Sequence, residues 1–280
     1  MKKLIRFLLI IILILSLLII YARYGGTRGL ITKEYQIETT IDDSFDGLKI
    51  VHFSDLHYLR ITNKETTQSI IEEINLLNPD IVVFTGDLID KDYKPNDKDI
   101  SNLKELLTSI KSKYGKYSVL GEHDIKVEDT IKDIYISSNF TLLDNSYDVI
   151  YGNNNNKLFI GGLSNNPDID KVMNYFTENE DINYKIILVH EPDYVDTITS
   201  KYNNTNLVLA GHSHNGQINI PYIKKLLLPE GSKKYYNNYY KVNNTNLYIS
   251  SGLGESNINF RLFNKPSINF YRINKRFYNI

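Results

Sequence analysis

Five short clusters of Asp, Glu, His and Gly recur along the chain, and each follows a run of apolar residues. In chain order they are Asp55-Leu56-His57, Gly86-Asp87-Leu88-Ile89-Asp90, Gly121-Glu122-His123-Asp124, His190 and Gly211-His212-Ser213-His214. Carboxylate oxygens and imidazole nitrogens are the donors that divalent metals take from proteins. One Asp-x-His has little weight in a chain of 280 residues. Five such clusters in this order predict a metal site.

The apolar runs before these clusters are typical of buried strands. They cover residues 48–53, 81–84, 117–120, 186–189 and 207–209, and further strands are expected at 147–151, 157–160, 247–249 and 268–271. Helical spacing of apolar residues predicts helices over 66–77 and 100–110. In α/β layers, ligands collect beyond the carboxyl ends of the strands. We therefore expect the five clusters to meet in one cleft.

Two of the clusters carry their donors two residues apart. Asp55 and His57 form one such pair, and His212 and His214 form the other. In an extended segment, side chains at this spacing point to the same side. The glycine that opens three of the clusters lets the backbone turn without a clashing Cβ.

Charge and cysteine content exclude several classes of protein. The formal net charge is −1, which argues against the broad basic surface of a non-specific nucleic-acid binder. The chain contains no cysteine, so disulfides, thiolate metal sites and cysteine nucleophiles are excluded. A metal-dependent nuclease stays open only as a third and disfavoured reading.

The N-terminus differs from the rest of the chain. Residues 7–22 are apolar apart from Ser16, and they follow Lys2, Lys3 and Arg6. A helix over this run is ~24 Å long, slightly short of a ~30 Å hydrocarbon core, and flanking Arg and Tyr side chains can extend its reach. A secretory signal cleaved after Ala22 and a buried core helix are the alternatives.

We expect an uncleaved single-pass anchor in the cell membrane. The predicted organisation is an anchor at 1–24, a tether at 25–34 and one catalytic domain at 35–280. The very short N-terminal tail and its likeness to a signal place this domain outside the cytoplasm, although positive charges flank the run on both sides.

The five clusters together resemble the calcineurin-like metallophosphoesterase superfamily, whose pattern is D-x-H, G-D-x-x-D, G-N-H-D/E, H and G-H-x-H. The segments 211–217 and 251–254 look closest to its bacterial membrane-anchored envelope branch. The resemblance implies an α/β four-layer fold, with two packed mixed β-sheets flanked by helices. It also implies two divalent metal ions (Mn, Fe or Zn) bridged by one Asp.

The resemblance assigns a role to each matched residue. Asp55, His57 and His214 match the ligands of one metal, Asp87 the bridging carboxylate, and His190 and His212 the ligands of the second metal. His123 matches the catalytic histidine beside the phosphate, and Asp90 the acid that orients it. Read without the family, Asp90 is also suited to cap a helix. Asp124 is interpreted as a cap or a supporting acid, and Arg261 as a structural or solvated residue rather than a phosphate contact.

Glu122 departs from the pattern, because the family has Asn at this position. A Glu oxygen can still bind a metal, but it adds a negative charge. We expect Glu122 to be a ligand of the second metal. Loss of that metal is the alternative, and it would leave a non-catalytic, membrane-anchored protein that binds metal or phosphate.

The expected activity is hydrolysis of a phosphomonoester or phosphodiester. In this class, two cations ~3.5–4 Å apart clamp the phosphate and supply hydroxide at neutral pH. His123 would protonate the leaving group as general acid. The N-terminal anchor favours a substrate of lipid or cell-wall origin.

Overall fold

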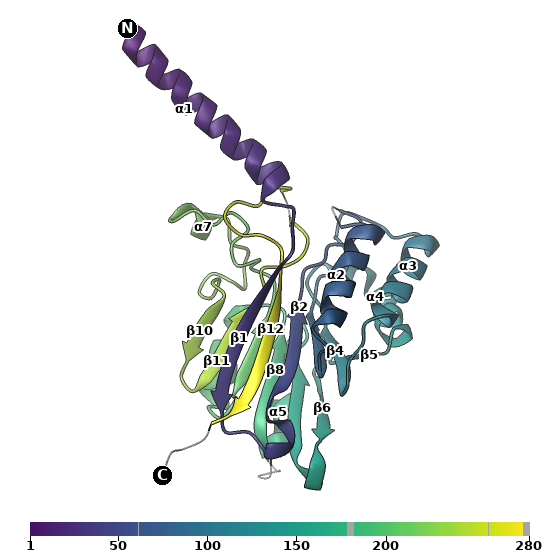
Figure 1. Ribbon diagram of the computed structural model, residues 1–280. Coiled ribbons are helices and arrows are strands. Elements are labelled where there is room, and N and C mark those ends of the chain that lie inside the picture. The colour runs from purple at the N-terminus through teal and green to yellow at the C-terminus, as the bar shows by residue number, and fades with distance from the viewer. Residues whose placement is uncertain (61, 178–181, 257, 277–280) are drawn as a thin grey trace.

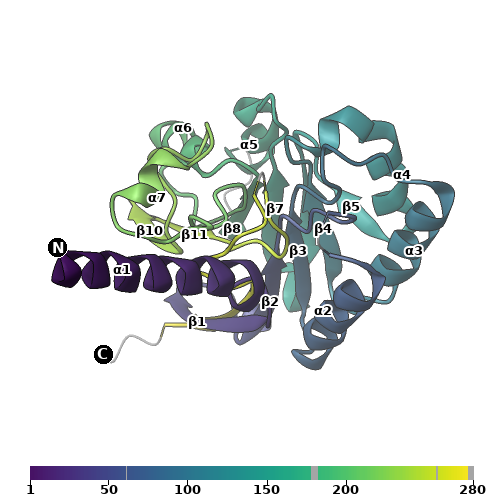
Figure 2. The same cartoon turned by 90° about the horizontal axis from the view of Figure 1, so that it is seen from above.

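The computed structural model describes all residues except 61, 178–181, 257 and 277–280. Two six-stranded mixed sheets pack face to face, and helices cover both outer faces (Figures 1 and 2). This is the four-layer α/β arrangement expected from the sequence, and it confirms the predicted fold class.

The first sheet carries the first three clusters. Its order is β1 (Ile31–Thr39), β12 (Ser267–Lys275), β2 (Leu48–Phe53), β3 (Ile81–Thr85), β4 (Gly115–Val119) and β5 (Phe140–Leu142). Strands β2 to β5 run parallel. Strand β12 runs antiparallel to β2 and parallel to β1.

The second sheet carries the two histidine clusters. Its order is β10 (Tyr239–Val242), β11 (Thr245–Ile249), β9 (Leu207–Ala210), β8 (Ile182–Val189), β7 (Lys157–Gly162) and β6 (Ser146–Tyr151). Strands β7, β8, β9 and β11 are parallel, and β6 and β10 are antiparallel edge strands. The predicted hairpin across the Asn-rich turn is β6–β7.

Two groups of helices cover the outer faces of the two sheets. They are α2 (Lys64–Leu76), α3 (Asp97–Thr108) and α4 (Glu128–Ser137) on the first sheet, α5 (Ile169–Thr177) and α6 (Val195–Lys201) on the second, and the short α7 (Ile223–Leu226) near the cleft. Single 3₁₀ turns occur at Asp43–Phe45, Asp124–Val127, Asn153–Asn155 and Pro192–Tyr194.

Residues of the central strands alternate between two cores. Ile50 and Val83 belong to the core between the two sheets, together with Leu209, while Val51 and Val82 belong to the core under the helices. A strand buried on both faces reads as a continuous apolar run, which is why these strands were predicted from the sequence. Strand β1 was not predicted, because this edge strand alternates polar and apolar residues and most of them are exposed or half-buried.

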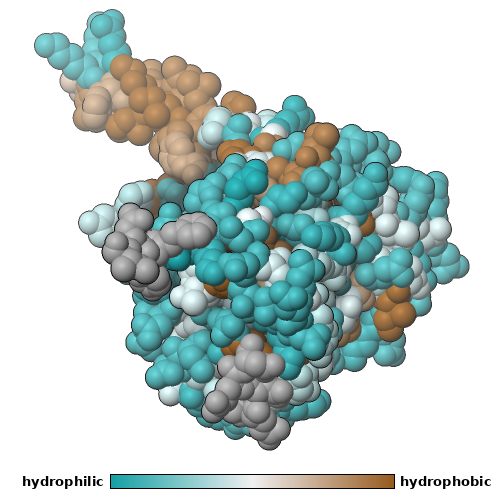
Figure 3. Space-filling model, turned by 60° about the horizontal axis from the view of Figure 1, so that its bottom comes forward, coloured by the Kyte–Doolittle hydropathy of each residue, from teal (hydrophilic) through white to brown (hydrophobic). Residues whose placement is uncertain are grey.

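The apolar N-terminal segment forms one helix that projects from the body (Figures 1 and 3). Helix α1 (Lys2–Ile20) continues into a π-helical turn at Tyr21–Gly25. The combined helix is long and apolar enough to cross a membrane, a property that signal sequences share. The expected tether at 25–34 contains the end of this turn and the start of β1.

Candidate metal centre

The predicted ligands meet at the carboxyl ends of five strands. Three groups have donor atoms within 4.8 Å of one another: Asp55, His57 and His214; His57, Asp87 and His123; Asp55, Asp87 and His190. All these side chains are buried. Backbone hydrogen bonds join the first two clusters, because the N–H groups of Asp55 and His57 donate to the carbonyls of Gly86 and Asp87.

Asp87 lies at the middle of the site. Its Oδ2 is 3.4 Å from His190 Nε2, 3.8 Å from His57 Nε2 and 4.0 Å from His123 Nε2. The side chain is almost completely buried. One carboxylate oxygen therefore faces imidazole nitrogens from three different loops.

The first side of the site is built by Asp55, His57 and His214. His214 Nε2 lies 3.5 Å from Asp55 Oδ1 and 3.3 Å from His57 Nε2. The two imidazole rings are stacked, with centroids 5.2 Å apart. Asp55 is held in place by the Ser54 hydroxyl and by the backbone N–H of His212.

The second side is more open. The side chain of Glu122 is 46% exposed, and its Oε1 lies 3.5 Å from His123 Nε2 and 4.0 Å from His212 Nδ1. The ring of His212 contacts that of His190, with centroids 4.9 Å apart. His212 Nε2 hydrogen-bonds the carbonyl of Glu230 at 2.5 Å, so Nδ1 is the nitrogen turned towards Glu122.

These spacings fit donors that share a metal ion. Donors ~2.1 Å from one ion, at angles near 90–110°, lie roughly 3.0–3.4 Å apart. The distances from Asp87 to His190 (3.4 Å) and from His214 to His57 (3.3 Å) are in this range, and both exceed those of strong hydrogen bonds. His123 Nε2 and His190 Nε2 are buried and make no hydrogen bond within the described part of the chain. The residues therefore suit a divalent metal.

The charges of Asp87 and His190 are strongly coupled. Burial by itself lowers the pKa of His190, but the carboxylates of Asp87 and Asp55 and the Thr85 carbonyl raise this pKa to about 10. Burial raises the pKa of Asp87, but His190, His57 and His123 together hold it well below its ordinary value.

The backbone that carries the ligands is not extended, contrary to our expectation. The φ angles are positive at Asp55 (50°), His57 (44°), Asp87 (60°), His212 (65°) and His214 (47°). Left-handed conformations are uncommon for residues other than glycine, and they cluster at functional sites. The paired side chains converge because the chain turns tightly beyond each strand, not because they lie on one face of a strand.

Glycines keep this turn region compact. A Cβ at Gly121 would lie 2.1 Å from Asp87 Oδ1, and one at Gly86 would lie 2.6 Å from the Gly121 nitrogen. Gly86 also has a φ of +90°. The second and third clusters pack so closely only because these positions lack a side chain.

Asp124 supports the site from behind, as the sequence indicated. Its carboxylate accepts the backbone N–H groups of Asp87, Leu88 and Gly121, each at 2.9 Å. The residue is fully buried. Asp124 therefore fixes the loop from which Asp87 projects.

Asp90 and His123 are placed differently from the expectation. Asp90 Oδ2 lies 3.5 Å from His57 Nδ1 and 3.2 Å from Arg60 Nη1. His123 Nδ1 instead accepts the backbone N–H of Lys91 at 3.3 Å. The hydrogen-bond partner that orients His123 is thus the backbone beside Asp90, while the Asp90 carboxylate faces His57.

Arg261 is a structural residue at the back of the cleft. It is fully buried, and its guanidinium donates to the carbonyls of Ser251, Gly252 and Gly254. Its Nη2 also lies 3.4 Å from His214 Nδ1. This agrees with the sequence-based interpretation.

Asn264 was missed. Its amide donates to the carbonyl of His214 at 2.5 Å and thereby fixes the last cluster. It lies in a loop with no metal-binding pattern, so nothing in the local sequence indicated this contact.

Comparison with known proteins shows the family of this chain. Residues 48–216 match the family described as calcineurin-like phosphoesterase. The chain is 32% identical over 262 residues to an uncharacterized metallophosphoesterase of Bacillus subtilis, YkuE, covering 90% of this chain and 88% of that protein.

Two other relatives are similar to this chain over most of the length of this chain. YkoQ of the same organism, another uncharacterized metallophosphoesterase, is 27% identical and covers 89% of this chain and 94% of its own length. A transmembrane protein with metallophosphoesterase domain from Danio rerio is 25% identical, over 81% of this chain and 53% of its own. The chain therefore belongs to the calcineurin-like phosphoesterase family.

Proposed function

We propose that the protein is a metal-dependent phosphoesterase that hydrolyses a phosphomonoester or a phosphodiester. The observation that carries the proposal is the position of Asp87, whose single Oδ2 faces His190, His57 and His123. A buried carboxylate surrounded by imidazoles is suited to bridge two ions.

The seven predicted ligands divide into two sets around Asp87. Asp55, His57 and His214 form the set for one ion, and Glu122, His190 and His212 form the set for the other. Oxygen and nitrogen donors of this kind suit Mn, Fe or Zn. When bound, a pair of such ions supplies charge stabilisation for the phosphate and hydroxide at neutral pH.

His123 is the proposed general acid. The Lys91 backbone N–H lies 3.3 Å from Nδ1, so Nε2 is the ring nitrogen turned towards the metal ligands. That nitrogen is buried and faces Asp87 and Glu122 from the metal side of the ring. Burial lowers the pKa of His123, but the Glu122 and Asp87 carboxylates outweigh it and raise this pKa above the ordinary value. The ring thus holds a proton where a leaving oxygen would need it.

The reaction balances without a covalent enzyme intermediate. A bond forms between water oxygen and phosphorus as the bond from phosphorus to the leaving oxygen breaks. The His123 imidazolium, which the raised pKa favours, gives its Nε2 proton to the leaving oxygen and becomes neutral, while the attacking water loses its proton to solvent. Solvent then reprotonates the His123 ring. General acid catalysis of this type contributes on the order of 10²–10⁴-fold.

The proposal places the protein in the envelope branch of the family, with α1 as a single-pass anchor and the catalytic domain outside the cytoplasm. An unburied apolar helix of 24 residues supports the anchor. The Danio rerio relative is likewise named as a transmembrane protein. A substrate of lipid or cell-wall origin follows from this location.

The test is hydrolysis by the full chain in phospholipid nanodiscs. Protein stripped of metal with chelator is reloaded with Mn²⁺, Zn²⁺ or Fe²⁺ and given 4-nitrophenyl phosphate and bis(4-nitrophenyl) phosphate. We expect at least one of these esters to be hydrolysed, and we expect chelator to abolish this hydrolysis. Folded, metal-loaded protein that hydrolyses neither ester would contradict the proposal.

A second candidate is a non-catalytic, membrane-anchored protein that binds metal or phosphate. The solvent exposure of Glu122 favours this second candidate, because the carboxylate is half-exposed and its Oε1 lies 4.0 Å from His212 Nδ1. Metal content separates the two candidates: about two ions per chain support the enzyme, and one or none supports the binding protein.

A further inference from the structure

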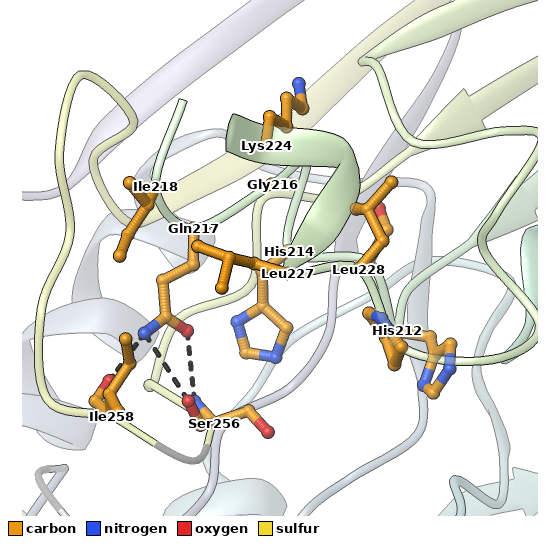
Figure 4. A pocket seen from close by; sticks show the side chains of 12 residues that line it. His212, His214, Gly216, Gln217, Ile218, Lys224, Leu227, Leu228, Ser256 and Ile258 are labelled. Atoms are coloured by element: carbon orange, nitrogen blue, oxygen red, sulfur yellow. Dashed lines mark hydrogen bonds between the residues drawn. The ribbon is translucent and has the colours of Figure 1, made fainter. Parts of the chain in front are cut away.

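A cavity opens directly beside the two histidines of the last cluster (Figure 4). Its volume is about 210 Å³, and it reaches both His212 and His214. Half of the remaining lining residues are apolar side chains, and Lys224 is the one charged side chain among the others. The apolar residues are Ile218, Leu227, Leu228, Pro229 and Ile258. A metal centre that handles only small polar phosphates has no need of such a wall.

Gln217 fixes the far wall of this cavity. Its amide nitrogen donates to the carbonyls of Ile258 (2.6 Å) and Phe260 (2.9 Å), and its oxygen accepts the Ser256 N–H (3.1 Å). These bonds use up the polar groups of the side chain, so Gln217 holds the loop rather than offering polar atoms to a ligand. The cavity is therefore a formed, largely apolar space next to the ligands.

Strand directions place this cavity on the side of the body from which α1 leaves. β12 runs antiparallel to β2, and β1 runs parallel to β12, so β1 begins at the edge where β2 ends in Asp55. The helix precedes β1 directly, and α7 lies on the side towards which α1 points in both views (Figures 1 and 2).

The base of the helix is also tied to the cavity loop. Arg261 N–H donates to the carbonyl of Ala22 at 2.9 Å, and a Cβ at Gly26 would overlap the Arg261 carbonyl. Arg261 follows Ile258 in the segment between β11 and β12. A bilayer spanned by α1 would therefore lie close to the mouth of the cavity.

Large apolar side chains are exposed on and near the segments that carry the cavity wall. Tyr222 is 92% exposed, Leu226 82% and Phe263 62%. The exposed Lys225 lies beside them on α7. Apolar side chains mixed with lysine are typical of surfaces that lie in the headgroup region of a bilayer.

We propose that the substrate is an amphiphilic phosphate ester of the bilayer, and that the cavity beside His212 and His214 receives its aliphatic part. The inference rests on the proposed function. The phosphate lies at the metal ligands, and the chain leaves it along Leu227 and Ile258. Burial of methylene groups there would favour long-chain esters over short ones.

The experiment compares esters that differ only in chain length. Full-length protein in nanodiscs is given ethyl and octyl phosphate, and ethyl and octyl 4-nitrophenyl phosphate. We expect kcat/KM to be at least about tenfold higher for the octyl member of the hydrolysed pair, because six more methylenes are buried. In the double variant Leu227→Ala, Ile258→Ala, this preference should fall several-fold.

Leu76→Ala is the matched control. Leu76 is 79% exposed on α2, on the first sheet's outer face, so the preference of this variant should equal that of the wild type. Equal rates for ethyl and octyl esters, with 4-nitrophenyl phosphate or its bis ester still hydrolysed, would overturn the inference alone. Failure to hydrolyse any ester would overturn the proposed function, and the inference with it.

Discussion

Asp87 Oδ2 lies 3.4 Å from His190 Nε2, and the two side chains are buried at the ends of β3 and β8. Although burial disfavours the charged ring, the Asp87 carboxylate raises the pKa of His190 to about 10 in the metal-free protein. The proton therefore occupies the nitrogen that a metal needs, and metal binding must displace it.

Metal binding should consequently release protons. Below a pKa of about 10 the His190 imidazolium must lose its proton before it binds, so metal affinity should rise with pH through the neutral range. Calorimetric titration with Zn²⁺ in two buffers of different ionisation enthalpy measures the protons released. We expect about one proton fewer for His190→Gln. An affinity equal at pH 6 and pH 8, with no proton release, would contradict the coupling.

His123→Gln should reduce turnover without loss of metal. Gln keeps a polar side chain at the site but cannot give up a proton, so kcat for an alkyl ester should fall on the order of 10²–10⁴-fold. 4-Nitrophenolate leaves without needing a proton, so its esters should lose much less. Elemental analysis checks that metal content is unchanged. An equal loss for alkyl and 4-nitrophenyl esters would exclude the role of general acid.

Variants of Glu122 test whether the second ion site is intact or degenerate. Its Oε1 is close to both His123 and His212, so Glu122→Ala should lower metal content towards one ion per chain. Glu122→Asn keeps a carbonyl oxygen and should retain two ions. Glu72→Ala, an exposed acid on α2, is the control. If Glu122→Ala keeps the metal content of the wild type, Glu122 is not a ligand.

Asp124→Asn should destabilise the protein and weaken metal binding. Asn has one acceptor oxygen for three backbone N–H groups, so buried donors lose their partner. Such losses cost about 2–4 kcal/mol of unfolding free energy in total. Urea unfolding followed by circular dichroism measures it, and exposed Glu38→Gln should show no change beyond ~0.5 kcal/mol. A stability equal to that of the wild type would argue against this supporting role.

The sequence predicted those strands whose residues are buried along most of their length. Strands β2, β3, β8 and β9 are buried on both faces and so appear as continuous apolar runs. The edge strand β1 was missed, because its mixed polarity also suits a loop.

The site was predictable to the level of residue identity but not of backbone geometry. The apolar strands with donors at their ends indicated that Asp55, Asp87 and His190 would meet, and they do. The left-handed turns could not be read from the sequence, because Asp and His adopt them only when tertiary contacts impose them. The same limit applies to Asp90, whose contact with His57 depends on how two loops pack.

The most direct test of the account is the metal content of the full chain and of Asp87→Ala, measured by elemental analysis after dialysis. Because the Asp87 carboxylate faces His57, His123 and His190, its removal should disrupt both ion sites at once. We predict about two divalent ions per wild-type chain and less than one in the variant. A wild-type chain without bound metal, or a variant that retains both ions, would contradict the metal centre.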